Sequence, residues 1–171
     1  MDESEFWGIV EASKAESGGT FDGHIEVLTA RLSALAPEKI VEFQGVFSAL
    51  QDRAYSWDLW GAAFVINGGC SDDGFTDFRS WLISMGRNTF ERALSDPESL
   101  VEITLGNDGE EDASFEEFGY VAAQAYEAST GKELPHPERD FPEKPSGEPW
   151  EEDEEELAGR YPKLFAKYGD G

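Results

Sequence analysis

The 171 residues carry 37 acidic and 13 basic side chains, and the resulting formal charge of −24 repels nucleic acid and anionic membranes while it attracts basic protein surfaces. A chain of this length fits one domain that buries about 70% of its unfolded surface, and the single cysteine, Cys70, excludes an internal disulfide. The N-terminus lacks the features of a signal peptide, and no stretch approaches the ~20 apolar residues of a membrane span. We therefore expect a cytoplasmic protein.

Helical signals dominate the first third of the chain. Asp2 and Glu5 have the spacing of a capping box, and Ser17-Gly18-Gly19 is expected to end the first helix. Asp22 is expected to cap the second helix, and Pro37 suits the first turn of the third, where its missing N–H would be unpaired anyway. Apolar residues recur every three to four positions: Phe6, Ile9 and Val10; Ile25, Leu28, Leu32 and Leu35; Ile40, Phe43, Phe47, Leu50 and Ala54.

Helical spacing continues to residue 131. The stretch 55–66 continues or restarts the third helix, and a polar loop is expected over 105–112. Ser114 and Glu117 form a second capping-box candidate, and Gly131 is expected to end the helix that follows. No convincing run of alternating apolar and polar residues indicates a sheet. We predict an all-α fold, a single compact domain of six to seven helices. A further stripe at helical spacing consists of Phe75, Phe78, Leu82 and Met85.

The composition changes after Lys132. Five of the eight prolines lie between Pro135 and Pro149, which favours an extended arm. Residues 151–156 are an unbroken acidic run, and apolar residues flank it, so we expect the end of the chain to dock on the body. The predicted organisation is a helical core domain over 1–131, an extended Pro-rich arm over 132–150 and an acidic C-terminal helix over 151–171 that docks on the core.

One segment, residues 57–83, gathers three of the five tryptophans, the only cysteine, a Gly-Gly pair and an Asp-Asp pair: WDLWGAAFVINGGCSDDGFTDFRSWLI. Asn67-Gly68-Gly69 is typical of a helix end, because glycine adopts positive φ without steric cost. Ser71 or Asp73 can cap the next helix. Turn and capping needs explain about half of the segment and leave Asp58, Asn67, one of Asp72 and Asp73, and Arg79 without an assigned role.

These polar groups suggest a site. The oxygens of Asp72 and Asp73 are candidates for acid–base chemistry or for holding a polar ligand, although we assign no catalytic residue. Arg79 either pairs with an aspartate or clamps an anion. The spacing fits no EF-hand, and we predict no metal site and no cofactor. The ligand-binding candidates are Trp57, Asp58, Asn67, Cys70, Asp72, Asp73, Arg79 and Trp81.

Three of these candidates also have a structural interpretation. A nucleophilic Cys70 needs a nearby base, and the two histidines, His24 and His136, are remote in the sequence, so a buried inert thiol is favoured. Aromatic residues at helical spacing, such as Trp57 and Trp81, more often belong to a core than to a ligand platform.

The motifs WDLW, INGGCSDDGF and FRSWLI closely resemble the signature of a bacterial domain-of-unknown-function family, number four-two-four-zero. The likeness extends across nearly the whole chain, from the Phe-Trp pair at 6–7 to the tail motif P-x-G-x-x-W at 145–150 and YPKL at 161–164. The resemblance implies a mostly helical cytoplasmic domain and no known activity. The family signature, as matched in this chain, retains Trp57, Asp58, Asn67, Gly68, Gly69, Cys70, Asp72, Asp73, Gly74, Phe75, Phe78, Arg79 and Trp81.

Three functions follow as hypotheses. The first is a non-enzymatic binding or regulatory module that recognises a basic protein or a small polar ligand through the surface around the NGGCSDDGF turn. The second is a small enzyme that uses Asp72 or Asp73 as acid and base with Arg79 as an anion anchor. The third is an acidic protein that sequesters a basic partner. The chain contains none of the nucleotide-binding, metalloprotease or hydrolase motifs, which favours the first hypothesis.

Overall fold

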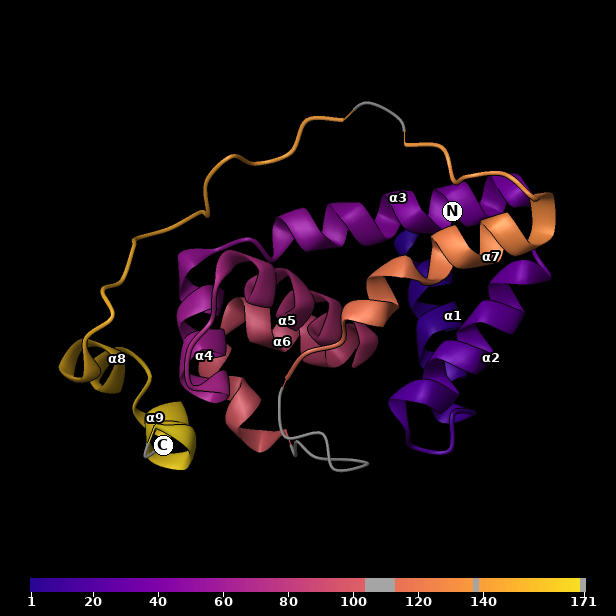
Figure 1. Ribbon diagram of the computed structural model, residues 1–171. Helices are drawn as coiled ribbons and strands as arrows, with labels where there is room; N and C mark the ends of the chain where they lie inside the picture. The colour runs from indigo at the N-terminus through magenta and orange to yellow at the C-terminus, as the bar shows by residue number, and fades with distance from the viewer. Residues whose placement is uncertain (104–112, 137–138, 170–171) are drawn as a thin grey trace.

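Helices account for the ordered elements of the computed structural model, which describes residues 1–103, 113–136 and 139–169 (Figure 1). No β-strand occurs in these ranges, which confirms the all-α prediction. The elements are α1 (Glu3–Ala15), α2 (Phe21–Ser33), α3 (Pro37–Arg53), α4 (Trp57–Asn67), α5 (Asp72–Ser84), α6 (Arg87–Ser95), the 3-10 helices η1 (Pro97–Glu102) and η3 (Glu116–Tyr120), α7 (Val121–Thr130), α8 (Glu154–Arg160) and α9 (Pro162–Tyr168).

The nine α-helices of the described ranges exceed the six to seven predicted. One reason is Gly86, whose φ of 103° separates α5 from α6. Another is Pro162, which has no N–H to continue α8 and instead opens α9. The expected C-terminal helix is therefore two short helices. The expected loop over 105–112 lies outside the described residues.

Local signals place most helix ends where the sequence predicts them. The Asp2 carboxylate accepts a hydrogen bond from Glu5 N at 2.8 Å, and Pro37 is the first residue of α3. Gly68 ends α4 with a φ of 68°, and the hydroxyl of Ser71 caps α5 by accepting from Gly74 N at 3.1 Å. These contacts satisfy backbone groups that helix ends leave unpaired.

Two predicted caps are wrong. Thr20, not Asp22, caps α2, because its hydroxyl accepts from Gly23 N at 2.8 Å while Asp22 already lies in the first turn. The box of Ser114 and Glu117 does not form: η3 begins at Glu116 without a side-chain cap. Phe115 N donates to Asp77 O of α5 at 3.1 Å, so a tertiary contact sets the start of this element.

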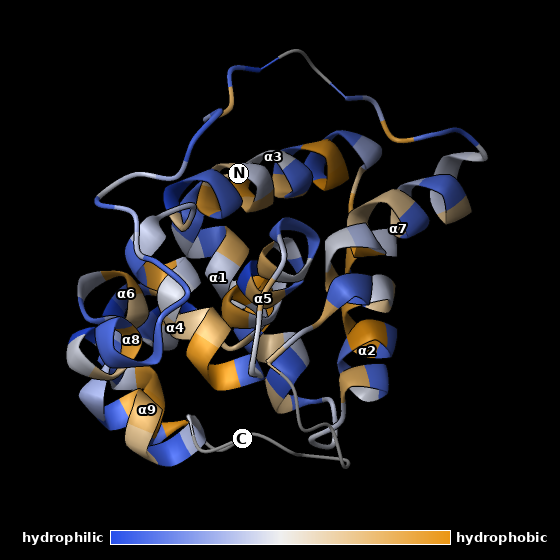
Figure 2. Ribbon diagram, turned by 60° about the vertical axis from the view of Figure 1, so that its left-hand side comes forward, coloured by the Kyte–Doolittle hydropathy of each residue, from blue (hydrophilic) through white to orange (hydrophobic). Residues whose placement is uncertain are grey.

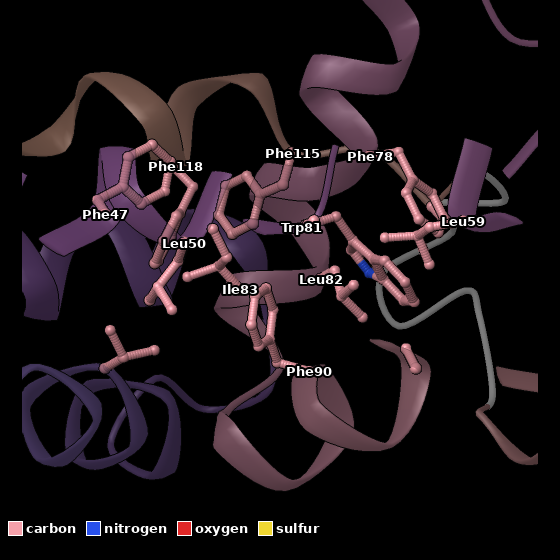
Figure 3. Close-up of a cluster of buried hydrophobic side chains, with 14 of the residues drawn as sticks. Phe47, Leu50, Leu59, Phe78, Trp81, Leu82, Ile83, Phe90, Phe115 and Phe118 are labelled. Atoms are coloured by element: carbon pink, nitrogen blue, oxygen red, sulfur yellow. The ribbon is translucent and has the colours of Figure 1, made fainter. Parts of the chain in front are cut away.

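The core forms where α5 lies among its neighbours. α5 packs against α3, α1, α6 and η3, and α2 packs against α1 and α7. Figure 3 shows Ile83 of α5 beside Leu50 of α3 and Phe90 of α6, with Trp81 toward Leu59 of α4. Burial of one such side chain stabilises the fold by about 1.5–3 kcal/mol. Figure 2 shows that apolar residues gather on helix faces that meet other helices, whereas the arm is mostly hydrophilic.

The arm and the last two helices return the chain to α4. The arm runs from the end of α7 past α3 to α8 (Figure 1), and α9 packs against α4 and η1. Leu157, Tyr161 and Leu164 are buried there. The Trp150 indole N–H donates to Trp57 O at 2.7 Å. The division of the chain into core, arm and docked tail at 131 and 150 stays a prediction.

Candidate functional site

Two of the predicted polar candidates have structural partners far along the chain. Asn67 Oδ1 accepts from Ala113 N at 3.0 Å, and Asn67 Nδ2 donates to Ala113 O at 3.2 Å. The Asp58 carboxylate forms an ion pair with Arg160 of α8. Asn67 therefore holds the chain at residue 113 against the end of α4, and Asp58 holds the C-terminal segment.

The contacts of the two tryptophan candidates and of the cysteine indicate structural roles. Trp81 is 3% exposed and belongs to the core. Trp57 stacks on Trp60 with ring centroids 5.4 Å apart, and its backbone N–H donates to Ser146 O at 2.8 Å. Burial raises the pKa of the half-buried Cys70 thiol to about 11. A thiol that stays protonated at neutral pH is a poor nucleophile, in agreement with the inert interpretation.

Arg79 differs from these candidates because it is buried without an ion-pair partner among the described residues. Its side chain is 8% exposed, and within the described residues no carboxylate lies within 4 Å of it. The guanidinium lies between two aromatic rings, 4.7 Å from the centroids of both Tyr55 and Phe75. Burial lowers the pKa of Arg79. Arg79 is thus a buried cation that aromatic faces and dipoles stabilise.

Backbone groups supply much of that stabilisation. Arg79 Nη1 donates to Gln51 O at 2.8 Å, in the last turn of α3, where the helix dipole is negative. Arg79 Nε donates to Phe75 O at 3.4 Å, and Nη2 donates to Thr76 Oγ1 at 3.2 Å. A guanidinium has five N–H groups, so the bonds found in the described part of the chain leave two N–H groups for another partner.

A cleft of about 450 Å³ opens beside Arg79, between the start of α5 and the arm. We call it the arm cleft. Asp72 lies at its wall, and Asp72 Oδ1 accepts from the Tyr55 hydroxyl at 3.4 Å. Phe141 of the arm is 66% exposed. The arm cleft is lined by Asp52, Tyr55, Asp72, Arg79, Arg139, Phe141, Pro142 and Glu143.

A second cleft of about 270 Å³ lies between α3, α5 and η3. We call it the inner cleft. It shares Asp52, Arg79 and Arg139 with the arm cleft, and Asp52 and Arg139 form an ion pair. The inner cleft is lined by Phe47, Ser48, Gln51, Asp52, Thr76, Asp77, Arg79, Ser80, Glu116, Gly119, Tyr120 and Arg139.

The candidate Asp73 and the acidic residue Glu117 line neither cleft. Asp73 lies exposed in the first turn of α5, and Glu117 is exposed on η3. Both lie near Asp77, whose pKa is raised by burial first and then by the negative charges of Glu116, Asp73 and Glu117. In the described part of the chain, no three His, Cys, Asp or Glu side chains are grouped as a metal site would require. No helix in that part is long and apolar enough to cross a membrane.

Sequence reasoning missed several residues of the clefts. Gln51 carries the clearest overlooked signal, because it is a polar residue four positions after Phe47 on the apolar stripe of α3. Asp77, Glu116 and Arg139 offered no such signal, since only tertiary packing brings them to the same cleft.

The chain belongs to the family described as protein of unknown function, DUF4240, whose family model matches residues 1–128. This match includes α1 to α6, η3 and most of α7, and hence the whole of the signature segment. The searches of curated proteins and of solved structures found no match. The membership confirms the family that the signature resembles, and it brings no activity with it.

Proposed function

We propose that this family member is a non-enzymatic binding module, and that the arm cleft and the inner cleft together hold a small polar ligand. The observation that carries the proposal is the position of Arg79. A buried guanidinium that has no carboxylate partner among the described residues lies on the wall that both clefts share. Charged groups with free hydrogen-bonding capacity in a concave surface are what ligand sites use to orient their ligands.

The dimensions of the clefts support a ligand of modest size. The arm cleft, at about 450 Å³, lies within the range of small-molecule sites. Its aromatic residues, Tyr55 and Phe141, offer apolar faces, while Asp72 and Arg79 offer charges of both signs. This combination favours a ligand that has both polar groups and an apolar part.

The surroundings of the two aspartates favour binding over acid–base chemistry. Asp72 and Asp73 both lie exposed in the first turn of α5. A general acid that works near neutral pH needs a carboxyl group that is removed from water, so that its pKa rises. Asp72 is better suited to accept hydrogen bonds at the cleft wall, as it does from Tyr55.

The test is a ligand screen by thermal unfolding, with amino acids, amines, carboxylic acids, sugars and nucleotides as probes. We expect at least one class to raise the melting temperature of the wild-type chain. Asp72→Asn should weaken that ligand by about fivefold or more, because it removes a charge from the cleft wall.

Asp73→Asn is the matched control. Asp73 is the next residue in the same helix turn, it is also exposed, and it lines neither cleft. The control variant should bind as the wild type does. Equal weakening by Asp72→Asn and Asp73→Asn, or a screen in which no probe shifts the melting temperature, would contradict the proposal.

A further inference from the structure

We infer that the inner cleft binds the ammonium group of a primary amine, either a free alkylamine or a lysine side chain of a partner. The inference rests on the proposed function, since it names the ligand class for part of the same site. Three features of the inner cleft lead to it: a buried acceptor and a pair of carboxylates that find no donor and no cation among residues 1–103, 113–136 and 139–169, and an apolar wall.

The unpaired acceptor is the side-chain oxygen of Gln51. This residue is 9% exposed at the cleft wall, and Oε1 has no hydrogen-bond partner among the described residues. Its amide nitrogen donates to Ser80 Oγ at 2.8 Å and to Thr76 O at 3.4 Å. Because a carbonyl can only accept, the nitrogen must face Thr76 and the oxygen must face away. A buried acceptor without a donor is unfavourable, and because neighbouring atoms cover Oε1 in the free protein, the Gln51 side chain must turn toward the cleft for a ligand N–H group to reach it.

The carboxylates that line the inner cleft would also be stabilised by a hydrogen-bond donor, in this case one that carries a positive charge. Asp77 and Glu116 both line it, and neither forms an ion pair within the described residues. Burial and neighbouring negative charges raise the pKa of Asp77, which means that its ionised form lacks a stabilising partner. An ammonium group between these carboxylates would supply one.

The arginines of the inner cleft do not neutralise these two carboxylates. Arg139 already pairs with Asp52. Arg79 bonds to the carbonyls of Gln51 and Phe75, and it belongs to the wall shared with the arm cleft. Asp77 and Glu116 line the inner cleft alone. The ammonium group therefore fits at the side formed by α5 and η3, and the rest of the ligand can extend toward Arg79.

The remaining walls suit the carbon chain of an amine. Gly119 leaves room beside the ring of Phe47, because a Cβ at this glycine would lie 3.5 Å from Ser80 Oγ and 3.9 Å from Phe47 Cζ. Tyr120, which is 52% exposed, adds an aromatic face at the rim, and such faces attract ammonium groups. A volume of about 270 Å³ accommodates a short alkyl chain rather than a bare ion.

The experiment is an NMR titration of the isotope-labelled full chain with butylamine, diaminobutane and blocked lysine (N-acetyl-lysine amide). Butanol and butyrate serve as isosteric probes without an ammonium group. We expect amine-dependent shifts at the amides of Ser80 and Gly119, and none with butanol or butyrate. Binding of blocked lysine would indicate a partner side chain, whereas binding of the free amines alone would indicate a small molecule.

The variant with Asp77→Asn and Glu116→Gln should weaken amine binding by about 10- to 100-fold, because two charge-assisted hydrogen bonds are lost. Asn and Gln keep the shape of the originals, and circular dichroism verifies the fold. The control carries Glu154→Gln and Glu155→Gln, the same change of charge on the exposed start of α8. Equal weakening by both variants would show that the amines follow the general field of the protein, and the inference would fall.

The outcomes also separate this inference from the proposed function. If the earlier screen finds a ligand that depends on Asp72 while no amine shifts the amides of Ser80 and Gly119, the binding module stands and the ligand class is wrong. If the amines bind with full dependence on Asp77 and Glu116 but are insensitive to Asp72→Asn, the inner cleft is the site, and the arm cleft has no part in it.

Discussion

At the scale of single residues, the protein stabilises its few buried polar side chains in different ways. Arg79 stays charged between two rings at the end of α3. His24 is instead buried as a neutral base. Its Nε2 lies 2.9 Å from Ser13 Oγ, and the Ser13 hydroxyl donates to Val10 O at 2.8 Å. Because that hydroxyl proton is already used, Nε2 must be the donor to Ser13, as in a neutral imidazole.

Protonation of His24 should therefore destabilise the fold at acidic pH. Burial lowers the pKa of His24 from 6.5 to about 4, so the unfolded chain takes up a proton at a higher pH than the folded chain. The stability linked to this group is complete above pH 6.5 and is lost as the pH falls through about 4. The loss amounts to about 3 kcal/mol.

Urea unfolding at several pH values, with His24→Gln beside the wild type, measures this effect. Glutamine can still donate to Ser13, but it does not titrate. The carboxylates titrate in both proteins, so the difference between their unfolding free energies isolates His24. That difference should change in favour of the variant between about pH 7 and pH 4. Parallel pH curves would mean that His24 is not the group responsible.

At the scale of elements, α4 holds the C-terminal segment through close backbone approach. The hydroxyl of Tyr161 donates to Asp58 O at 2.5 Å, and Tyr161 is 2% exposed. This approach requires a glycine at position 61: a Cβ there would lie 2.4 Å from Tyr161 Oη and 2.8 Å from two of its ring carbons. Glu98 adds to the docking, because its carboxylate accepts from Lys163 N and Leu164 N at the start of α9.

We therefore expect Gly61→Ala to lower the free energy of unfolding by about 1–3 kcal/mol, because the methyl group would displace a buried tyrosine ring. Gly45→Ala is the control, since Gly45 lies in α3 and a Cβ there would meet no atom within 4 Å. The control should gain about 0.5–1 kcal/mol from helix propensity alone. Urea unfolding compares the two, and equal stability of both variants would show that Tyr161 does not constrain position 61.

The helices that the sequence predicts well are those with local determinants. Pro37 and Ser71 act on backbone groups within three residues of themselves, so pattern alone finds them. The candidate site is only partly predictable. Arg79 and Asp72 do line a cleft, but the partners of Asp58 and Asn67 are 102 and 46 residues away. Periodicity carries no information on such pairings, which depend on how the helices pack.

At the scale of the whole molecule, negative charge far exceeds what the ion pairs neutralise. The chain has 37 acidic and 13 basic side chains, and in each ion pair of the described residues at least one partner is substantially exposed. Exposed pairs contribute little to stability, whereas repulsion among the excess carboxylates acts across the whole surface. The same excess of negative charge would attract a basic protein, and that such a protein is a partner stays a prediction.

Salt should therefore stabilise this protein, although salt weakens attractive ion pairs. Raising NaCl from about 0.05 M to about 0.5 M shortens the screening length to a few ångströms and should raise the melting temperature by about 3–6 °C, which for a chain of this length corresponds to roughly 1–2 kcal/mol. Calorimetry at constant pH measures the shift. A variant with glutamine at three exposed positions outside the ion pairs, Glu26, Glu127 and Glu133, should melt higher than the wild type at low salt and gain less from added salt, because less repulsion remains to be screened. A melting temperature that falls with salt would mean that the exposed ion pairs outweigh the repulsion.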